Sequence, residues 1–397
     1  MKRKDIFGWR EFLALCALVA VFAAGCSGFG ESDEEAAGPS FRYALVACAD
    51  WAGQNSLAAI QLKPAANPRP WMDYLVDLGD DVWLDPVVRT NDRSGQHRAF
   101  VIQREYGSAN LGTIAVLDPG ARFQVAGRYP VNDGINFANP HDLLVLSADK
   151  AYVTRWDWLY NDILILDPDT GATSGTIDFT GKGTNADGLP RLHKMLYLQG
   201  RVWILMQNID KSWNYSPGLV AVVNPLTDEI EDIISLNLKN PTDLAYDTEV
   251  NRLYVAATGD WFDPATGGIE AINPFSHTSV GVLIHGEDLG GFITDMALLD
   301  SRNAYLAVYK ADFSGTKVVH VNPTTGTLVK TLYEYPGFFL TDDPSALALD
   351  ERQNLLIADK TGFRVVVLDL KSGLITDTIE TLVPPVSIAI WEGEDKL

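Results

Sequence analysis

Short apolar stretches alternate with turn-forming residues along most of the chain. The stretches 220–223 and 355–357, for example, are each followed within a few residues by Gly, Pro, Asn or Asp. Short runs rich in β-branched and aromatic residues are typical of strands, and the residues between them are typical of turns. No convincing amphipathic helix follows residue 40. The pattern therefore predicts an all-β protein made of many short strands.

One phrase recurs in this pattern: an apolar strand, then Asp or Asn, then Pro in all but the last copy. The Asp or Asn stands at Asp118, Asp167, Asn224, Asn273, Asn322 and Asp369. The steps between copies are therefore 49, 57, 49, 49 and 47 residues. Asp or Asn accepts hydrogen bonds from the backbone of its own turn, and Pro fixes φ, so each phrase predicts a strand that enters a hairpin. A period of roughly 40–50 residues with short strands predicts a β-propeller with four-stranded blades.

The two ends of the repeat region complete one another. Residues 42–51 resemble residues 304–313, which include the second strand of a repeat, and residues 385–390 resemble a first strand with no partner after it. The N- and C-terminal strands are therefore expected to share one blade and close the ring. Six internal repeats and the shared one predict seven blades, and residues 41–397 supply 357 residues, or 51 for each blade.

Two strands carry a family resemblance. Ala151-Tyr152-Val153-Thr154 nearly spells the repeat that names the YVTN-type propellers, and residues 251–255 are close to the usual strand of that repeat. The pattern also resembles NHL repeats and the periplasmic YncE-like proteins. The resemblance spans about residues 41–397 and implies a seven-bladed β-propeller. It implies little about activity, because such propellers include binding scaffolds, surface-layer components and enzymes.

The first residues have the features of an export signal. Four basic residues lie at positions 2–10, and an apolar run at 12–24 is too short to span a bilayer. The run ends in Ala23-Ala24-Gly25-Cys26, which resembles the bacterial lipobox. The resemblance implies that residues 1–25 are a lipoprotein signal peptide and that Cys26 carries lipid, including palmitate. An ordinary secretory peptide cut near Ala24 is the alternative.

The rest of the chain fits an exported, anchored protein. Residues 26–40 are small, acidic and flexible and are expected to form a tether before the propeller domain at 41–397. Ser27 after the cysteine is associated with the outer membrane of Gram-negative bacteria. After removal of Cys16 and lipidation of Cys26, Cys48 has no disulfide partner.

The net charge is −21, and loss of four basic and two acidic residues with the signal peptide makes it −23. Such a charge argues against nucleic acid and anionic membrane surfaces as partners.

Several loops between second and third strands place an acidic residue beside an aromatic one. These loops are expected on one face of the ring, where exposed aromatic side chains either pack against the next blade or bind a ligand. Both interpretations stay open, and the ligand would be a protein, a peptide, a glycan or a cationic group. The binding candidates are Trp158, Tyr160, Trp213, Tyr215, Trp261, Asp157 and Asp260.

Asp142, Asp243 and Asp295 lie in the first strands of three blades and are expected near the mouth of the central channel. Three convergent carboxylates can bind Ca²⁺, which prefers oxygen ligands, so these residues are metal candidates. In the alternative interpretation each Asp caps its own inter-blade turn. His193 or Lys194 takes the same place in an intervening blade, and a basic residue there weakens the metal hypothesis. No other cofactor is indicated.

Motifs of common enzymes are absent from the sequence, including Gly-x-Ser-x-Gly, His-Glu-x-x-His and a phosphate loop. We therefore expect a lipid-anchored propeller with a binding or scaffolding role at the cell envelope. One alternative is a metal-dependent lactonase-type hydrolase that uses the three aspartates. Another is a periplasmic redox partner subunit without covalent haem, because Cys-x-x-Cys-His does not occur.

Overall fold

The structure of the protein is a computed structural model. It describes residues 41–50, 54–62, 70–79, 85–91, 97–104, 112–337 and 347–393. The predicted signal peptide, the lipidation site Cys26 and the tether at 26–40 lie outside these residues. Among the described residues, none of the helices has the length and hydropathy needed to cross a bilayer.

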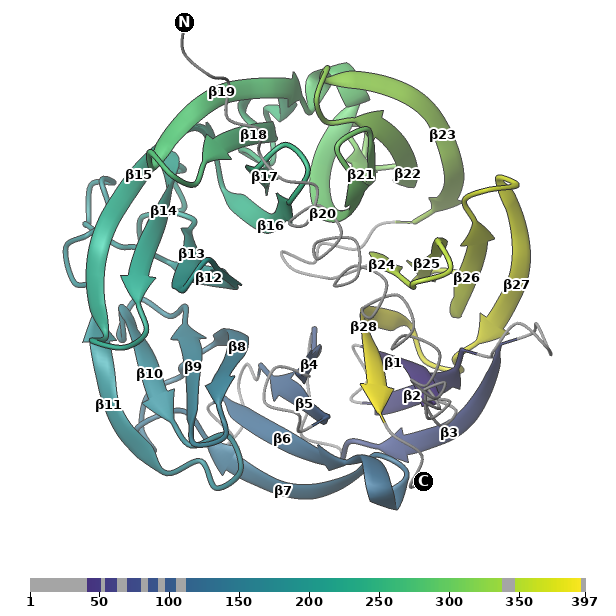
Figure 1. Ribbon diagram of the computed structural model, residues 1–397, viewed down its shortest axis with the longest axis horizontal. Coiled ribbons are helices and arrows are strands. Elements are labelled where there is room, and N and C mark those ends of the chain that lie inside the picture. The colour runs from purple at the N-terminus through teal and green to yellow at the C-terminus, as the bar shows by residue number, and fades with distance from the viewer. Residues whose placement is uncertain are drawn as a thin grey trace, which may run out of the picture. The chain divides into compact units, whose positions relative to one another are not determined.

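Seven antiparallel sheets of four strands each are arranged in a ring (Figure 1). This arrangement confirms the predicted seven-bladed β-propeller. Helix is confined, in the part of the chain described, to three 3₁₀ turns: η1 (Pro119–Ala121), η2 (Pro264–Thr266) and η3 (Glu287–Leu289). We number the blades in chain order and name the shared blade last.

The first three blades lie between residues 87 and 239. Blade 1 consists of β4 (Val87–Asn91), β5 (Arg98–Gln103), β6 (Thr113–Asp118) and β7 (Gln124–Pro130). Blade 2 consists of β8 (Pro140–Ser147), β9 (Lys150–Arg155), β10 (Asp162–Leu166) and β11 (Thr173–Asp178). Blade 3 consists of β12 (Leu192–Leu198), β13 (Arg201–Met206), β14 (Pro217–Asn224) and β15 (Glu229–Lys239).

The next three blades follow the same plan. Blade 4 consists of β16 (Pro241–Asp247), β17 (Arg252–Ala257), β18 (Gly268–Asn273) and β19 (Thr278–His285). Blade 5 consists of β20 (Gly291–Asp300), β21 (Asn303–Lys310), β22 (Gly315–Asn322) and β23 (Thr327–Pro336). Blade 6 consists of β24 (Leu347–Leu349), β25 (Asn354–Asp359), β26 (Arg364–Asp369) and β27 (Leu374–Glu380).

The two ends of the ring meet in blade 7, as the sequence predicts. Its strands, from the axis outward, are β28 (Pro385–Gly393), β1 (Phe41–Ala49), β2 (Asn55–Gln61) and β3 (Trp71–Asp77). Blade 7 is also bonded to blade 1. The Val88 amide donates to Ser387 Oγ at 3.0 Å, and Trp391 Nε1 donates to the His97 carbonyl at 2.9 Å. The ring is therefore closed by side chains as well as by strand pairing.

The hydrophobic core lies between the blades rather than at the axis. Leu45 of blade 7 and Val101 of blade 1 belong to one buried cluster, and Trp203 of blade 3 and Val255 of blade 4 belong to another. Each blade thus buries both faces against its neighbours, which lets a ring of small sheets grow beyond the size of a single-core domain.

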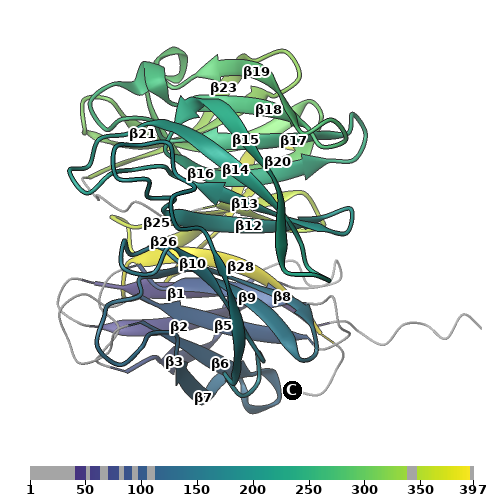
Figure 2. The ribbon, with the colours of Figure 1, turned by 90° about the vertical axis from the view of Figure 1, so that its left-hand side faces the viewer.

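The ring has two faces of different construction. The turn face carries the turns between first and second strands and between third and fourth strands. The loop face carries the loops between second and third strands and the connections between blades. Figure 2 shows the ring from the side. First strands begin at the loop face, so residues near their beginnings lie toward that face.

Candidate functional site

The three predicted channel aspartates join consecutive blades. Each accepts a hydrogen bond through Oδ2 from a backbone amide in the first strand of the next blade. The pairs are Met195 with Asp142 at 2.7 Å, Met296 with Asp243 at 3.1 Å and Leu347 with Asp295 at 2.7 Å. At the ring closure, Ser387 Oγ accepts a hydrogen bond from the Val88 amide in the same way. These hydrogen bonds join neighbouring blades. They give one carboxylate oxygen of each aspartate a structural role.

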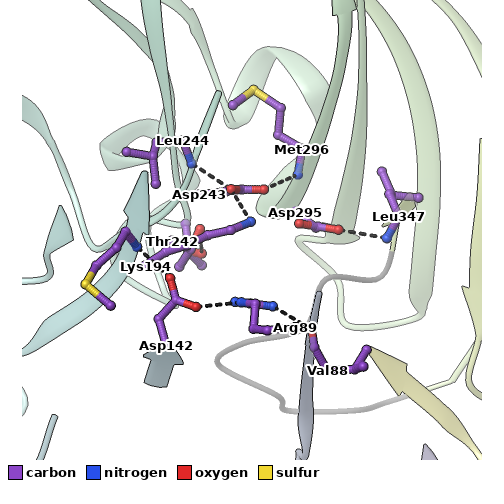
Figure 3. Close-up of polar contacts among 12 residues, drawn as sticks. Val88, Arg89, Asp142, Lys194, Thr242, Asp243, Leu244, Asp295, Met296 and Leu347 are labelled. Atoms are coloured by element: carbon purple, nitrogen blue, oxygen red, sulfur yellow. Dashed lines mark hydrogen bonds and ion pairs between the residues drawn. The ribbon is translucent and has the colours of Figure 1, made fainter. Parts of the chain in front are cut away.

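The remaining oxygens of Asp142 and Asp243 face basic side chains near the axis (Figure 3). Asp142 Oδ1 accepts from Arg89 Nε at 2.5 Å, and Asp243 Oδ1 pairs with Lys194 Nζ. The two carboxylates are 3% exposed, whereas the side chains of Arg89 and Lys194 are 17% and 23% exposed. A molecule that approaches the axis therefore meets the basic groups before the carboxylates beneath them.

Asp295 differs from the other two aspartates because its neighbour is another carboxylate. Burial raises the pKa of Asp295 well above its ordinary value, and the adjacent charge and hydrogen bond of Asp243 raise it further. Asp295 therefore keeps its proton to a higher pH than an ordinary carboxyl group does. Asp243 and Asp295 thus form an acid pair, with Lys194 on the Asp243 side.

Lys360 adds a buried amine to this region. It directly follows β25, at the loop face of blade 6. Burial lowers the pKa of Lys360 to about 8, while the charges of Asp85 and Asp295 act in the opposite direction. Shifted carboxyl and amine groups near one axis are the combination found at acid–base sites.

The geometry at the aspartates does not favour Ca²⁺. No group of three or more His, Cys, Asp or Glu side chains is placed to hold a metal among the residues that the structure describes. An ion at these aspartates would compete with Arg89 and Lys194 and with the backbone amides. The predicted Ca²⁺ site stays a prediction, and the chemistry proposed below uses no metal.

A column of rings runs through blades 2 and 3. His193 and His141 lie 4.8 Å apart, and His141 stacks on Trp156 at 5.2 Å. Trp156 contacts Trp213 at 5.8 Å and carries the Arg191 guanidinium 4.0 Å from its ring centre. Burial, reinforced by Arg104, lowers the pKa of both histidines well below 6.5, so both rings are neutral.

Two of the predicted aromatic residues are exposed on the loop face. Trp158 is 41% exposed and Trp213 is 53% exposed. They lie in equivalent loops of neighbouring blades, and these loops touch, because Lys211 Nζ lies 4.4 Å from the ring centre of Trp158. Trp158, Trp213 and Lys211 therefore form one surface, which we call the tryptophan surface.

The other predicted residues serve local structure. The Tyr160 hydroxyl bonds the backbone of Asp133 and Asn136, and Tyr215 bridges to Ile209. Trp261 packs against Phe292 at 5.3 Å and Tyr309 at 6.2 Å.

The two acidic candidates accept hydrogen bonds from their own loops. Asp157 accepts from the Leu159 amide at 3.0 Å, and Asp260 accepts from the Phe262 amide at 3.1 Å. Burial raises the pKa of Asp157. The structure thus separates the candidates into an exposed pair of tryptophans and a group that stabilises loops.

Sequence reasoning missed Arg89 and Lys360. Blade 1 has Val87 where the first strands of blades 2, 4 and 5 have Asp142, Asp243 and Asp295, so no pattern indicated where β4 lies. Lys360 directly follows the second strand of blade 6, at a place that holds Trp156 in blade 2 and Thr258 in blade 4, so the repeat has no fixed residue type there and no signal singled out Lys360.

Similar solved structures share the fold. The periplasmic gluconolactonase of Pseudomonas aeruginosa matches with 12% identity and a TM-score of 0.61, covering 89% of this chain and 99% of its own. A provisional 6-phosphogluconolactonase of Bacteroides fragilis matches with 12% identity and a TM-score of 0.60, covering 88% and 98%. The virginiamycin B lyase of Staphylococcus aureus has 14% identity and a TM-score of 0.51, covering 79% and 92%. No family model and no curated protein matches the sequence.

Proposed function

We propose that the acid pair Asp243–Asp295, with Lys194, is the working site of a hydrolase that opens a small cyclic ester. The observation that carries this proposal is the neighbouring pair of buried carboxyl groups beside an ammonium group. The fastening of blades explains one oxygen of each aspartate but not the approach of two carboxyl groups to each other. A buried carboxyl group whose pKa is raised in this way suits a general acid or base role.

Hydrolysis needs two proton transfers and one charge to be stabilised. Water attacks the ester carbonyl carbon, and the acid pair accepts a proton from that water. The partly exposed Lys194 ammonium stabilises the negative charge that develops on the carbonyl oxygen. The ring C–O bond then breaks, and the acid pair returns a proton to the leaving oxygen. The net change is the addition of one water molecule.

Two fold neighbours bear gluconolactonase names, and this supports a cyclic ester as the substrate class. The likeness is one of fold, so the residues of this chain have to carry the chemistry. One similar structure is a lyase, so the same fold also supports reactions other than lactone hydrolysis.

The test is hydrolysis of glucono-1,5-lactone by the mature chain, followed by pH-stat titration. Asp295→Asn is expected to lower the rate by about 100-fold or more, because it removes the proton of the pair. Asp142→Asn is the matched control: Asp142 also fastens two blades but pairs with Arg89, so this variant should keep the parent rate.

Metal content is measured by mass spectrometry on the same sample, with and without a chelator. A parent rate no faster than spontaneous hydrolysis, or equal rates in both variants, would remove the proposal.

We further propose that this activity is held at the cell envelope by lipid on Cys26. The short apolar run and the Ala-Ala-Gly-Cys sequence support this part, as does the periplasmic origin of one fold neighbour.

A second candidate function is binding without catalysis on the tryptophan surface. It is favoured by the exposure of Trp158 and Trp213, since large exposed aromatic side chains in adjacent loops often mark a ligand surface.

A further inference from the structure

One position sets the turns of blades 3 and 4 apart from the other copies of the recurring phrase. The residue after Pro, or after Leu370 in the degenerate copy, lies at the tip of each turn. It is Gly120, Asp169, Thr324 and Lys371 in blades 1, 2, 5 and 6. In blades 3 and 4 it is Leu226 and Phe275, which are 90% and 73% exposed. Two neighbouring blades thus present large apolar side chains where the repeat otherwise has small or polar ones.

Both tips are held firmly. The Leu226 amide donates to Asn224 Oδ1 at 3.0 Å, and the Phe275 amide donates to Asn273 Oδ1 at 2.9 Å. The blade 3 turn is also tied to blade 2, because Lys150 Nζ donates to the Pro225 carbonyl at 2.7 Å. These side chains are therefore presented to solvent on a fixed backbone, and they do not fold back into the core.

Two acidic groups near the Leu226 tip pair with basic groups. Asp228 pairs with Lys150 at 2.6 Å, and Glu231 pairs with Arg201. Asp232 contacts His277 at 3.0 Å. Basic side chains therefore balance part of the acidic charge around the tips. Such a surface suits a neutral, zwitterionic headgroup layer, whereas an anionic layer would require a basic cluster.

The chain enters the propeller on this same face. Second strands begin at the turn face, and β1 is the second strand of blade 7. Arg42, next to the start of β1, pairs with Glu351 in the turn between β24 and β25 at 2.5 Å. Cys26 lies 15 residues before Phe41, a length that reaches about 50 Å at most. A lipid on Cys26 therefore keeps the bilayer within reach of the turn face.

We infer that the turn face is seated on a zwitterionic bilayer and that Leu226 and Phe275 insert into its interface. This inference rests on the proposed envelope location. β1, which follows the predicted tether in the sequence, belongs to blade 7, whereas the two apolar tips lie on the opposite side of the ring in blades 3 and 4 (Figure 1). Attachment on both sides lays the ring flat. The loop face, with the tryptophan surface and the first-strand aspartates near it, then points away from the membrane.

The test uses residues 27–397 with a hexahistidine tag at the N-terminus, bound to nickel-chelating lipid in phosphatidylcholine–phosphatidylethanolamine vesicles. The tag holds the ring at the position of Cys26, so seating is measured whether or not Cys26 is lipidated in the cell. An environment-sensitive fluorophore is attached at Leu226→Cys or Phe275→Cys, and acyl-chain nitroxides serve as quenchers. The native Cys48 is fully buried and does not compete for the label.

The matched control is Phe262→Cys, since Phe262 is 91% exposed and lies on the loop face. Label at 226 and 275 should shift to the blue and be quenched on vesicle binding, and label at 262 should do neither. Replacement of the unlabelled tip residue by Ser should reduce quenching at the other tip at least twofold. Equal quenching at all three sites, or quenching at 262 alone, would overturn the inference. A cell in which Cys26 is unmodified would contradict the anchor and leave this result unchanged.

Discussion

The carboxyl group of Asp295 lies beside that of Asp243 at the joint between blades 4 and 5. Burial and the charge of Asp243 together raise the pKa of Asp295. Both residues also accept an amide hydrogen bond from the next blade. Asp295 thus both joins two blades and has a raised pKa, so the stability of the ring and the proposed chemistry depend on the same side chain.

The first prediction concerns the pH dependence of stability. A folded-state pKa raised above the ordinary 3.8 means that the folded chain keeps a proton that the unfolded chain loses. The contribution of Asp295 is therefore fully present below about pH 4 and is lost as the pH rises through the folded pKa. Asp295→Asn cannot titrate. The free energy of unfolding of the variant minus that of the parent should increase from about pH 4 upward, measured by urea unfolding. A difference that does not change with pH would contradict the shared proton.

The sequence predicted the fold well because the fold depends on local chemistry. The turn signals at Asp167-Pro168 and Asn224-Pro225 act within a few residues, and their spacing alone indicates a ring of blades. The pairing of β28 with β1 was also predictable. The C-terminal end resembles a first strand with no second strand after it, and the N-terminal end begins with a second strand.

The site was predicted only in part. Asp243 and Asp295 were placed near the axis, but their mutual approach depends on how two blades are set against one another. The local sequence does not encode that distance. The tryptophans illustrate the same limit: Trp158 and Trp261 occupy similar loops, yet Phe292 and Tyr309 cover only Trp261.

A second prediction has the opposite sign in pH. His193 is kept neutral in the folded chain, while the unfolded chain takes up a proton below about pH 6.5. This lowered pKa gives stability that is present above 6.5 and lost as the pH falls. His193→Gln removes the titration. The stability of the variant relative to that of the parent should therefore increase as the pH falls from about 7 to about 5. Thermal melting at both pH values provides the measurement, and parallel losses in the two proteins would argue against a buried neutral His193.

The third prediction concerns ring closure. Removal of residues 383–397 takes away β28, exposes the edge of β1 and removes the Ser387 and Trp391 bonds to blade 1. Because every blade packs on two neighbours, the loss should lower the melting temperature of the whole ring.

Trp391→Ala should destabilise the ring less than the truncation does. We expect it to lower the free energy of unfolding by about 3–5 kcal/mol, since Trp391 is 3% exposed. A truncated chain that melts like the parent would show that closure adds no stability.

The fourth prediction concerns the anchor. Cys26→Ser should move the mature protein from the detergent phase to the aqueous phase, because the lipid would be lost with the thiol. Phase partitioning of both proteins from the same cells makes the comparison. Identical partitioning would remove the lipoprotein interpretation and restore the ordinary secretory peptide.

The fifth prediction concerns the tryptophan surface. Trp158 and Trp213 are 41% and 53% exposed, and Trp213 also contacts the buried Trp156, so Trp158→Ala combined with Trp213→Ala should lower the unfolding free energy by no more than about 1 kcal/mol. Trp261→Ala is the contrasting variant: Trp261 packs between Phe292 and Tyr309, and its loss should cost about 1–3 kcal/mol. Urea unfolding measures both.

The same double variant decides whether the surface binds. Titration with neutral oligosaccharides and with choline, followed by tryptophan fluorescence, should give a signal in the parent that the double variant lacks. A cationic ligand must compete with Lys211 for the face of Trp158, so Lys211→Ala should tighten choline binding, by up to about tenfold for 1.4 kcal/mol of cation–π attraction. A double variant that loses its fold would assign the tryptophans to structure. A folded one that still binds would place the ligand elsewhere on the ring.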